Sequence, residues 1–256
     1  MELSFIRDKY GGLSYQELLS RVKEKHVPIH LAVIMDGNGR WAKSRGLPRQ
    51  AGHKTGVDKI NEILAACNDL GIEILTLYAF STENWRRPET EVNFLMDLFY
   101  RTIKKEYKEL HRNNIKVRFL GQRKDLPQRV SQEMDKVTSL TENNDSQILN
   151  LALNYGGRAE IIEATRDLLA AVKSRKIHPD EIDEDLFSSY LDTGGLPDPE
   201  LLIRFGGEMR ISNFLLWQLA YAEILVTETF WPDFTREELC LAILEFQDRE
   251  RRFGGV

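Results

Sequence analysis

The segment Leu31-Ala-Val-Ile-Met35, followed directly by Asp36-Gly-Asn-Gly-Arg40, carries the strongest indication of the fold. Five consecutive apolar residues are typical of a parallel strand that is buried on both faces. The two glycines that follow predict a turn, after which a helix begins. A buried strand that leads through a polar turn into a helix is the first half of a βαβ unit, so this segment favours an α/β fold.

Strand-like and helix-like segments alternate along the rest of the chain. Apolar residues at helical spacing predict helices over 60–67, 92–103 and 161–172, and Gly71 is the expected end of the first. Thr235-Arg-Glu-Glu238 is a capping box that begins a last helix. Further strands are expected at 72–80, 116–120, 148–153, 201–203 and 223–229. We expect a single domain over 1–256 with a mainly parallel six-stranded sheet flanked by helices, preceded by a helical arm over 1–26.

The composition excludes several classes of protein. The chain has 256 residues, of which 42% are hydrophobic and 29% charged, which argues against a disordered or collagen-like chain. The longest apolar run, Leu239 to Leu244, has six residues, whereas a membrane helix needs about 20. The start of the chain lacks the pattern of a secretory signal. Only Cys67 and Cys240 are present, which argues against a disulfide scaffold or a zinc site, so we expect a cytoplasmic protein.

The net charge of −5 argues against a nucleic-acid partner, but the charge is unevenly distributed. Between Asp36 and Lys54 the only acid is Asp36, and the basic residues are Arg40, Lys43, Arg45, Arg49 and Lys54. This cluster follows a glycine turn, which favours a small anionic ligand over a merely solvated helix face. The acidic stretch Asp180–Asp185 is interpreted as a helix N-terminus rather than a metal site.

Four polar segments each follow a predicted strand, and each contains an arginine. They are Asp36–Arg40, Ser81–Arg87, Asn154–Arg158 and Arg204–Arg210. Open α/β sheets bind ligands beyond the carboxyl ends of their strands, so these segments are expected to meet at one edge. Turn chemistry explains their glycines and asparagines, but it does not explain the arginines.

The first of these segments has the chemistry of a magnesium–diphosphate or nucleotide site. Gly37 and Gly39 let the backbone approach a ligand, and successive N–H groups there form a nest for an anion. Arg40 and Arg49 are suited to bidentate phosphate binding. Asp36 fits if Mg²⁺ bridges it to phosphate oxygens. No Walker A pattern is present.

A second basic group, formed by Arg204, Arg210 and Ser212, predicts a second phosphate-bearing substrate, and Arg87 can serve either group. Apolar residues near both groups suggest that at least one substrate has an apolar body. Trp41 and Trp85 lie inside polar segments, so they are the aromatic residues that we expect to contact it.

Six segments together resemble the cis-prenyltransferase family, from about His30 to Gly255. They are His30–Ala42, Gly52–Lys54, Leu75–Pro88, Asn154–Arg158, Ser212–Gln218 and Arg249–Gly255. The resemblance implies a Mg²⁺-dependent homodimer that adds isopentenyl diphosphate repeatedly to farnesyl diphosphate with new double bonds in the Z form. It favours undecaprenyl diphosphate, the cell-wall lipid carrier precursor, as product. Because water must be kept from the developing cation, an apolar product tunnel is expected. The small Ala79 either leaves room in this tunnel or simply packs in the core. Whether the protein contacts the membrane transiently to release an insoluble product is left open by the sequence.

The resemblance also implies roles for individual residues. Asp36 would hold Mg²⁺ with Glu223. Asn84 is the family's proton acceptor, and since an amide is a poor base we expect it to position a proton path. The allylic site would comprise Gly37, Asn38, Gly39, Arg40, Trp41, Arg49 and His53. The mobile loop would contribute Ser81, Thr82, Glu83, Trp85 and Arg87 besides Asn84. Isopentenyl diphosphate would bind Arg204, Arg210, Ile211 and Ser212. The C-terminal Arg252–Gly255 would reach the partner's active site.

One residue departs from the family pattern, which has a small hydroxyl residue where this chain has Phe205. Loss of a charge-assisted hydrogen bond costs about 1.5–3 kcal/mol. From the sequence we therefore predict weaker isopentenyl diphosphate binding or a shifted local backbone, without loss of activity, and a lower KM for isopentenyl diphosphate after Phe205→Thr.

Three alternative functions fit the sequence less well. A noncatalytic partner subunit would lack much of the substrate apparatus, which this chain retains. A phosphatase with a strand-end aspartate would need Asp-x-Asp, but position 38 is asparagine. An all-helical trans-prenyltransferase would need DDxxD motifs, and the sequence has no Asp-Asp pair.

Overall fold

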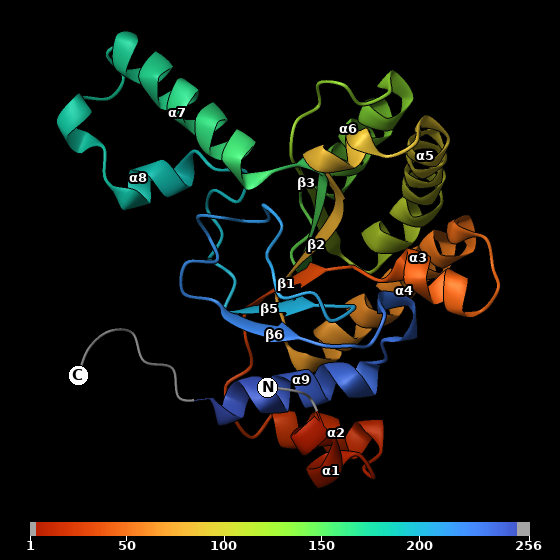
Figure 1. Cartoon of the computed structure of the whole chain (residues 1–256). Helices are drawn as coiled ribbons and strands as arrows, with labels where there is room; N and C mark the ends of the chain where they lie inside the picture. Colours follow the sequence, from red (N-terminus) through yellow and green to blue (C-terminus); the bar gives the residue numbers. More distant parts are fainter. Residues whose placement is uncertain (1–3, 250–256) are drawn as a thin grey trace.

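Six parallel strands form one sheet in the order β3-β4-β2-β1-β5-β6 (Figure 1). The computed structural model describes residues 4–249. The strands are β1 (His30–Ile34), β2 (Ile74–Ser81), β3 (Ile115–Leu120), β4 (Gln147–Tyr155), β5 (Leu201–Arg204) and β6 (Glu223–Val226). This confirms the predicted six-stranded parallel sheet. Because β1 lies between β2 and β5, the segments that follow these three strands leave the same edge side by side.

Most of the long helices cover one face of the sheet. They are α4 (Arg49–Leu70), α5 (Glu89–Arg112), α6 (Gln128–Thr141) and α9 (Arg236–Asp248). Side chains alternate between the faces, so Leu31 and Val33 of β1 belong to the core shared with α4 and α9, whereas Ala32 and Ile34 point to the other side. That second face is covered mainly by residues 211–222, which include the buried Phe214.

Two short helices at the N-terminus are part of the main core. Helices α1 (Ser4–Tyr10) and α2 (Tyr15–Val22) lie next to α9 (Figure 1). A capping box between Ser14 and Glu17 begins α2, whose buried Leu18 and Val22 join the core cluster of α9. The segment is helical, as predicted, and it is packed against the body of the protein.

The remaining helices are α3 (Asn38–Ser44), α7 (Gly157–Lys173) and α8 (Glu184–Ser189). Figure 1 shows α7 and α8 extending away from the sheet, on the other side of the molecule from α5 and α6. The acidic stretch 180–185 does begin a helix, because Asp183 caps α8 by accepting a hydrogen bond from the Leu186 N–H at 2.8 Å. In the described part of the chain, no helix combines the length and apolar character that a bilayer crossing requires.

Two helix predictions were incomplete. Helix α4 begins at Arg49, well before its predicted apolar face, and its first half carries His53 and Gly56, which line the cavities described below. Helix α6 was not predicted, although its buried Val130, Met134 and Val137 have helical spacing.

Candidate active site

Asp36 lies at the end of β1 and joins the two predicted anion-binding groups. Its Oδ2 atom is 2.9 Å from Nη2 of Arg204, and its Oδ1 atom accepts a hydrogen bond from the Gly37 N–H at 2.6 Å and lies 3.5 Å from Nη2 of Arg40. Arg204 is close because it ends β5, where it is in register with Ile34 of the neighbouring β1. The carboxylate therefore sits between two guanidinium groups from different segments.

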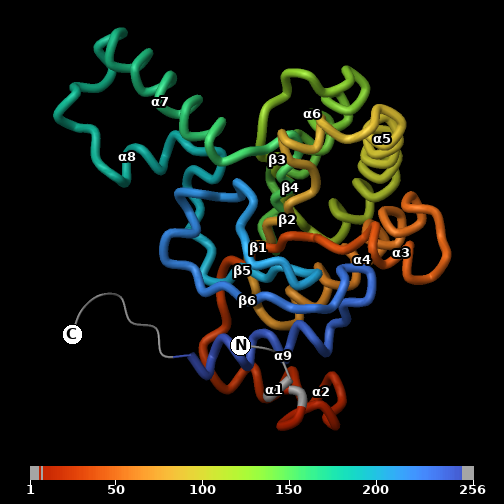
Figure 2. Tube along the Cα trace, in the orientation of Figure 1, coloured from red at the N-terminus to blue at the C-terminus, as the bar shows by residue number. Residues whose placement is uncertain are grey.

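The turn after β1 requires glycine at position 37. Its φ of 91° lies in the left-handed region, and a Cβ atom there would lie 2.5 Å from Cδ1 of Phe230. Phe230 belongs to the segment after β6, which Figure 2 shows beside α3. The Trp231 N–H donates to the Asp36 carbonyl at 3.1 Å, so this distant segment helps to hold the turn.

Arg204 is buried, with 3% of its surface exposed, and its guanidinium is held by several acceptors. Its Nη1 donates to Oγ of Ser212 at 2.8 Å and to the carbonyl oxygen of Arg210. The Arg210 side chain is exposed and pairs with Glu208, whose carboxylate is also 3.7 Å from Arg40. Arg204 is thus fixed before any ligand binds, whereas Arg210 has more freedom to adjust.

A third group forms around Glu91, a residue of the first turn of α5. Its Oε1 atom is 3.0 Å from Nη1 of Arg87, 3.2 Å from Nε of Arg49 and 3.7 Å from Nε2 of His53. Burial is the main cause that lowers the pKa of His53 to about 4, and Arg87 lowers it further, so this imidazole is neutral at pH 7. Glu91 is not among the site residues predicted from the sequence, although its position four residues after Arg87 signals an ion pair across the start of the helix.

The segment after β2 is anchored by its own polar side chains. The Ser81 N–H donates to Oδ1 of Asn84 at 3.2 Å, and Glu83 accepts a hydrogen bond from Nδ2 of Asn213 at 2.8 Å. Trp85 donates from Nε1 to Oδ1 of Asn154 at 2.7 Å. In this conformation Trp85 and Glu83 hold the segment in place.

A cavity of about 350 Å³ lies where these groups meet. Its lining includes twelve of the nineteen site residues named from the sequence: Asp36, Gly37, Asn38, Gly39, Arg49, His53, Ser81, Asn84, Arg87, Arg204, Arg210 and Ser212. The structure therefore brings all four anticipated chemical groups, namely the carboxylate, both arginine groups and the Asn84 amide, to one edge of the sheet.

Six other named residues lie outside the lining of the cavity: Arg40, Trp41, Thr82, Glu83, Trp85 and Ile211. Arg40 donates to the Gly206 carbonyl at 2.7 Å. Trp41 donates to Asp233 at 2.6 Å, and Arg45 lies 4.5 Å above its ring, so this indole is engaged away from the cavity. Thr82 donates to Glu83 at 3.2 Å, and Ile211 packs against the core of the second face.

Glu223 is the one named residue that lies far from the others. It begins β6 in register with Leu201, whereas Asp36 follows the opposite ends of the strands. Leu201 pairs with Leu31, which is five residues before Asp36, so the separation along the strands is about 16 Å. The Glu223 carboxylate pairs with Arg249 at 3.0 Å. Within one chain the structure does not bring Glu223 to Asp36, so their joint metal site stays a prediction.

Without Glu223, the described residues can hold Mg²⁺ only through Asp36 together with oxygens of a bound substrate. No cluster of three or more His, Cys, Asp or Glu side chains suited to a metal exists within residues 4–249. Mg²⁺ is commonly held by one or two carboxylates together with phosphate oxygens of a substrate. Each oxygen of Asp36 has a second lone pair, so this carboxylate can hold the ion jointly with a diphosphate.

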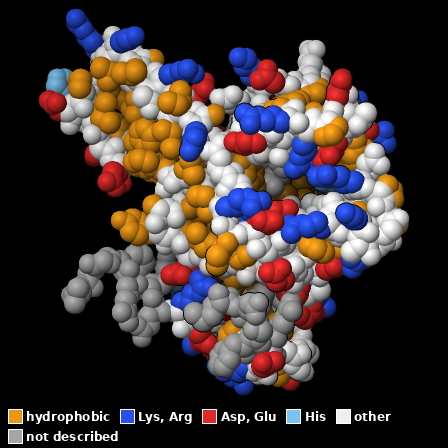
Figure 3. Space-filling model, in the orientation of Figure 1, with side chains coloured by type: hydrophobic (Ala, Val, Ile, Leu, Met, Phe, Trp, Pro, Cys, Tyr) orange, Lys and Arg blue, Asp and Glu red, His pale blue; other side chains and the backbone are white. Residues whose placement is uncertain are grey.

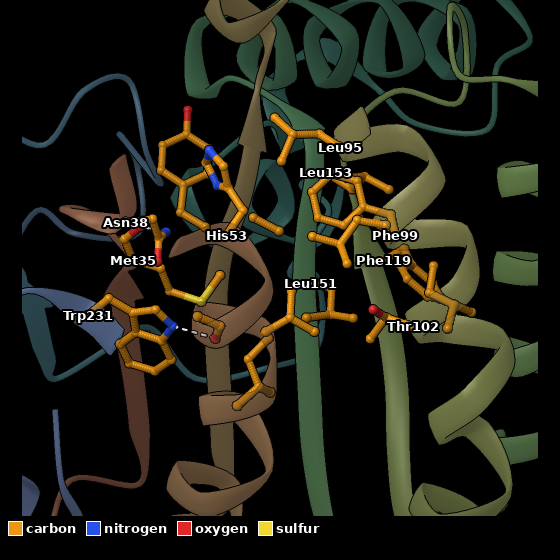
Figure 4. Close-up of a pocket in the computed structure, with 17 residues that line it drawn as sticks. Met35, Asn38, His53, Leu95, Phe99, Thr102, Phe119, Leu151, Leu153 and Trp231 are labelled. Carbon is orange, nitrogen blue, oxygen red and sulfur yellow. Dashed lines mark hydrogen bonds between the residues drawn. The ribbon is translucent and has the colours of Figure 1, made fainter. Parts of the chain in front are cut away.

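An apolar cavity, whose lining residues are drawn in Figure 4, adjoins the polar one. The two cavities share six lining residues: Met35, Asn38, His53, Tyr78, Ala79 and Leu95. Farther in, Figure 4 shows Phe99 and Thr102 of α5 facing Phe119 and Leu151 of the sheet. A third cavity of about 610 Å³ shares Thr102, Phe119 and Leu151 with the second and continues between α4 and α5. Apolar space therefore lies directly behind the charged groups.

Residues 34–254 match a family model described as "Putative undecaprenyl diphosphate synthase". The chain belongs to this prenyltransferase family. It is 51% identical over 241 residues to an isoprenyl transferase of Heliobacterium mobile, covering 94% of this chain and 93% of the relative. A ditrans,polycis-undecaprenyl-diphosphate synthase ((2E,6E)-farnesyl-diphosphate specific) of Legionella pneumophila is 50% identical over 230 residues, with 90% and 97% covered.

A solved prenyltransferase structure also matches closely. The lavandulyl diphosphate synthase from Lavandula x intermedia, in complex with dimethylallyl diphosphate, has a TM-score of 0.86 and 38% identity, and the match covers 90% of this chain and 99% of that one. Sequence and fold therefore agree on the prenyltransferase family, and the resemblance found from the motifs is confirmed.

Phe205, the residue that departs from the family pattern, points away from the polar cavity. Its ring is fully buried, 4.5 Å from the ring of Phe234 and 5.2 Å from that of Trp231. Arg204 and Phe205 are consecutive at the end of a strand, so one side chain faces the site and the other the core. This position gives no direct contact between the Phe205 ring and the polar cavity, which removes the basis for the predicted effect on isopentenyl diphosphate.

Proposed function

We propose that this chain is a cis-prenyltransferase that condenses isopentenyl diphosphate stepwise onto farnesyl diphosphate and forms a long Z-polyprenyl diphosphate, undecaprenyl diphosphate by analogy with its relatives. The observation that carries the proposal is the 2.9 Å ion pair between Asp36 and Arg204, because it joins two anion-binding groups directly above an apolar cavity. A substrate pair with two charged ends and one apolar body matches this arrangement.

Arg49, Arg87 and the backbone of Gly37 and Gly39 would bind the allylic diphosphate. Arg204, Arg210 and Ser212 would bind isopentenyl diphosphate. When bound at Asp36, Mg²⁺ would neutralise negative charge on the allylic diphosphate. The two basic groups hold the reactants next to each other, which lowers the entropic part of the barrier.

In the reaction, the C–O bond of the allylic diphosphate breaks and inorganic diphosphate leaves. A C–C bond forms to the terminal carbon of isopentenyl diphosphate, and one proton is lost. The arginines stabilise the negative charge that develops on the leaving group. Asn84 would position the path of the proton, since it lines the cavity and its Oδ1 is fixed by the Ser81 N–H. The apolar wall excludes water from the allylic cation.

The growing chain would occupy the two cavities behind Ala79, of which the farther also has charged side chains in its lining, namely Lys54, Asp58, Asp97, Arg101, Lys105 and Glu106. The cavity nearest the reaction centre holds only about 90 Å³, whereas the next holds about 610 Å³. A polyprenyl chain would therefore have to widen the passage between α4, α5 and the sheet. Contact with a membrane would help an insoluble product to leave, and we expect the enzyme to work in the cytoplasm.

We further propose a homodimer. Supporting evidence is the apolar surface of the α7–α8 hairpin, where Ile162 and Leu169 are more than half exposed and Ile182 is 43% exposed. Figure 3 shows hydrophobic side chains gathered on this part of the molecule. The C-terminal Arg252–Gly255 lies outside the described residues, so its contribution to a partner's site stays a prediction.

Nothing in the site favours a noncatalytic subunit, because the carboxylate, the arginines and the Asn84 amide all line one cavity. The decisive experiment is incubation of the purified chain with farnesyl diphosphate and labelled isopentenyl diphosphate, with Mg²⁺ or a chelator. A Mg²⁺-dependent product near C55 is expected, and a failure to elongate while both substrates bind would overturn the proposal.

Two arginine variants give a matched control. Arg49 lines the cavity, whereas Arg45 pairs with Asp233 away from it. Arg49→Ala is expected to raise the KM for farnesyl diphosphate about 10- to 100-fold, the effect of losing a charge-assisted hydrogen bond, while Arg45→Ala leaves it near wild type.

A further inference from the structure

Glu91 lies behind the basic wall of the proposed diphosphate site. Its three partners Arg49, Arg87 and His53 line the polar cavity, but Glu91 itself does not. All three contacts go to a single oxygen, Oε1, at 3.0 Å from Arg87, 3.2 Å from Arg49 and 3.7 Å from His53. The Glu91 side chain is 14% exposed and that of Arg87 is 30% exposed, so water screens this pair only in part. Arg49 is 58% exposed, so its contact with Glu91 is screened more strongly.

The three partners come from different parts of the chain. Arg49 and His53 lie on consecutive turns of α4, and Arg87 ends the segment that follows β2. Glu91, at the start of α5, links these elements through one carboxylate. Any anion that binds to Arg49 and Arg87 has to compete with the Glu91 carboxylate for these two guanidinium groups.

The charge of this cluster suits an anion that must leave repeatedly. His53 is neutral at pH 7, so Arg49 and Arg87 contribute +2 and Glu91 reduces the sum to +1. Each condensation releases inorganic diphosphate, a multiply charged product that two uncompensated arginines would retain. A site that elongates one chain through several cycles needs this product to dissociate before the next cycle.

We infer that Glu91 is the internal counter-anion of the diphosphate site, which exchanges with inorganic diphosphate at Arg49 and Arg87 and so promotes release of this product. Glu91 is a positioning residue in this role, because it acts through the arginines and does not touch the reacting atoms. The inference rests on the diphosphate site proposed above.

The test uses Glu91→Gln, which keeps the size of the side chain and removes its charge. Inorganic diphosphate, with and without Mg²⁺, is the probe in calorimetric binding and in product inhibition. We expect it to bind about five- to tenfold more tightly to this variant, the size of effect for one partly buried charge near two others. The steady-state kcat should fall, while the rate of a single condensation, measured before product release, should stay near wild type.

Glu89→Gln is the matched control, because it removes the same charge from the same turn of α5 at an exposed position. It should leave diphosphate affinity unchanged. Glu91→Asp, which keeps the charge on a shorter side chain, should stay closer to wild type than Glu91→Gln, and it provides a second test if Glu91→Gln folds poorly.

The outcomes separate this inference from the proposed function. Suppose that the wild type binds diphosphate and that Arg49→Ala weakens this binding. Unchanged or weaker diphosphate binding by Glu91→Gln would then overturn the role of Glu91. If wild type does not bind diphosphate, or Arg49→Ala has no effect on it, the proposed site itself is wrong. A fall in the single-condensation rate equal to the fall in kcat would show that Glu91 supports the chemical step instead of product release.

Discussion

Asp36 and Arg204 are 168 residues apart in the chain, yet their side chains form an ion pair of 2.9 Å. The pair exists because β1 and β5 are parallel neighbours whose carboxyl ends coincide. Arg204 is almost fully buried, so its charge needs Asp36 and the oxygens of Ser212 and Arg210 as partners. The same carboxylate is the proposed Mg²⁺ ligand, which links the stability of this edge to catalysis.

Asp36→Asn should therefore abolish most activity. The amide keeps the shape of the side chain but removes the charge that faces Arg204 and the metal, so kcat is expected to fall at least about 100-fold. Steady-state assays at saturating Mg²⁺ measure this, and thermal unfolding checks that the fold persists. Activity within about threefold of wild type would exclude Asp36 as the metal ligand.

Phe205→Thr should lower stability. Loss of the ring from its contacts with Trp231 and Phe234 leaves a cavity and buries a hydroxyl, which costs about 3–5 kcal/mol. Denaturant unfolding at pH 7 measures the loss, and Phe205→Leu, which refills part of the space, should cost less. A lower KM for isopentenyl diphosphate without a change in stability would instead restore the interpretation made from the sequence.

The fold was largely predictable because buried parallel strands leave long apolar runs in the sequence, as at 31–35. The edge where the site forms followed from the topology, since all four polar segments come after strands. The directions in which individual side chains point were harder to predict from the sequence. Trp85 is expected to contact substrate because it lies in a polar segment. In the structure its indole is hydrogen-bonded to Asn154 and packs edge-on against Phe80, so the substrate contact stays a prediction.

Glu91 and Phe205 show why part of the site could not be predicted from the sequence. The role of Glu91 depends on the packing of α4 against α5, and no local sequence pattern predicts which helices pack together. Phe205 was judged by comparison with a hydroxyl residue, and only the alternation of side chains at the end of β5 shows that it faces the core. Both cases depend on packing between distant segments.

The stability of the protein should fall below neutral pH because of His30. Its Nδ1 atom donates to the Pro197 carbonyl at 2.7 Å, so its Nε2 accepts from the Thr76 hydroxyl at 2.7 Å, and the ring is neutral. Burial lowers the pKa of His30 to about 4, compared with the ordinary value of 6.5. Between these values the unfolded chain binds a proton that the folded chain does not, so stability decreases as the pH falls from 6.5 to 4.

The lowered pKa of His30 corresponds to at most about 3 kcal/mol over this pH range. Urea unfolding at pH 7 and pH 5 measures the change. His30→Gln should reduce the pH dependence of the unfolding free energy, and the remaining dependence includes that of His53, whose pKa is also lowered to about 4. An identical pH dependence in the variant would show that His30 is not the group responsible.

Gly52→Ala tests how closely α3 and α4 must pack for the site to form. A Cβ atom at position 52 would lie 1.9 Å from the carbonyl oxygen of Asn38, which is backbone and has little room to move. The two helices would have to separate, which would displace Gly39 and Arg49 at the cavity wall. We expect a loss of about 1–3 kcal/mol in unfolding free energy. We also expect a higher KM for farnesyl diphosphate.

Gly12→Ala is the control for this substitution, because a Cβ atom there meets no atom within 4 Å. It should leave both stability and KM near wild type. If Gly52→Ala lowers stability but leaves KM unchanged, the spacing of α3 and α4 matters for folding alone. A change in KM at Gly52 that is absent at Gly12 would tie the proposed binding of the allylic diphosphate to this helix contact.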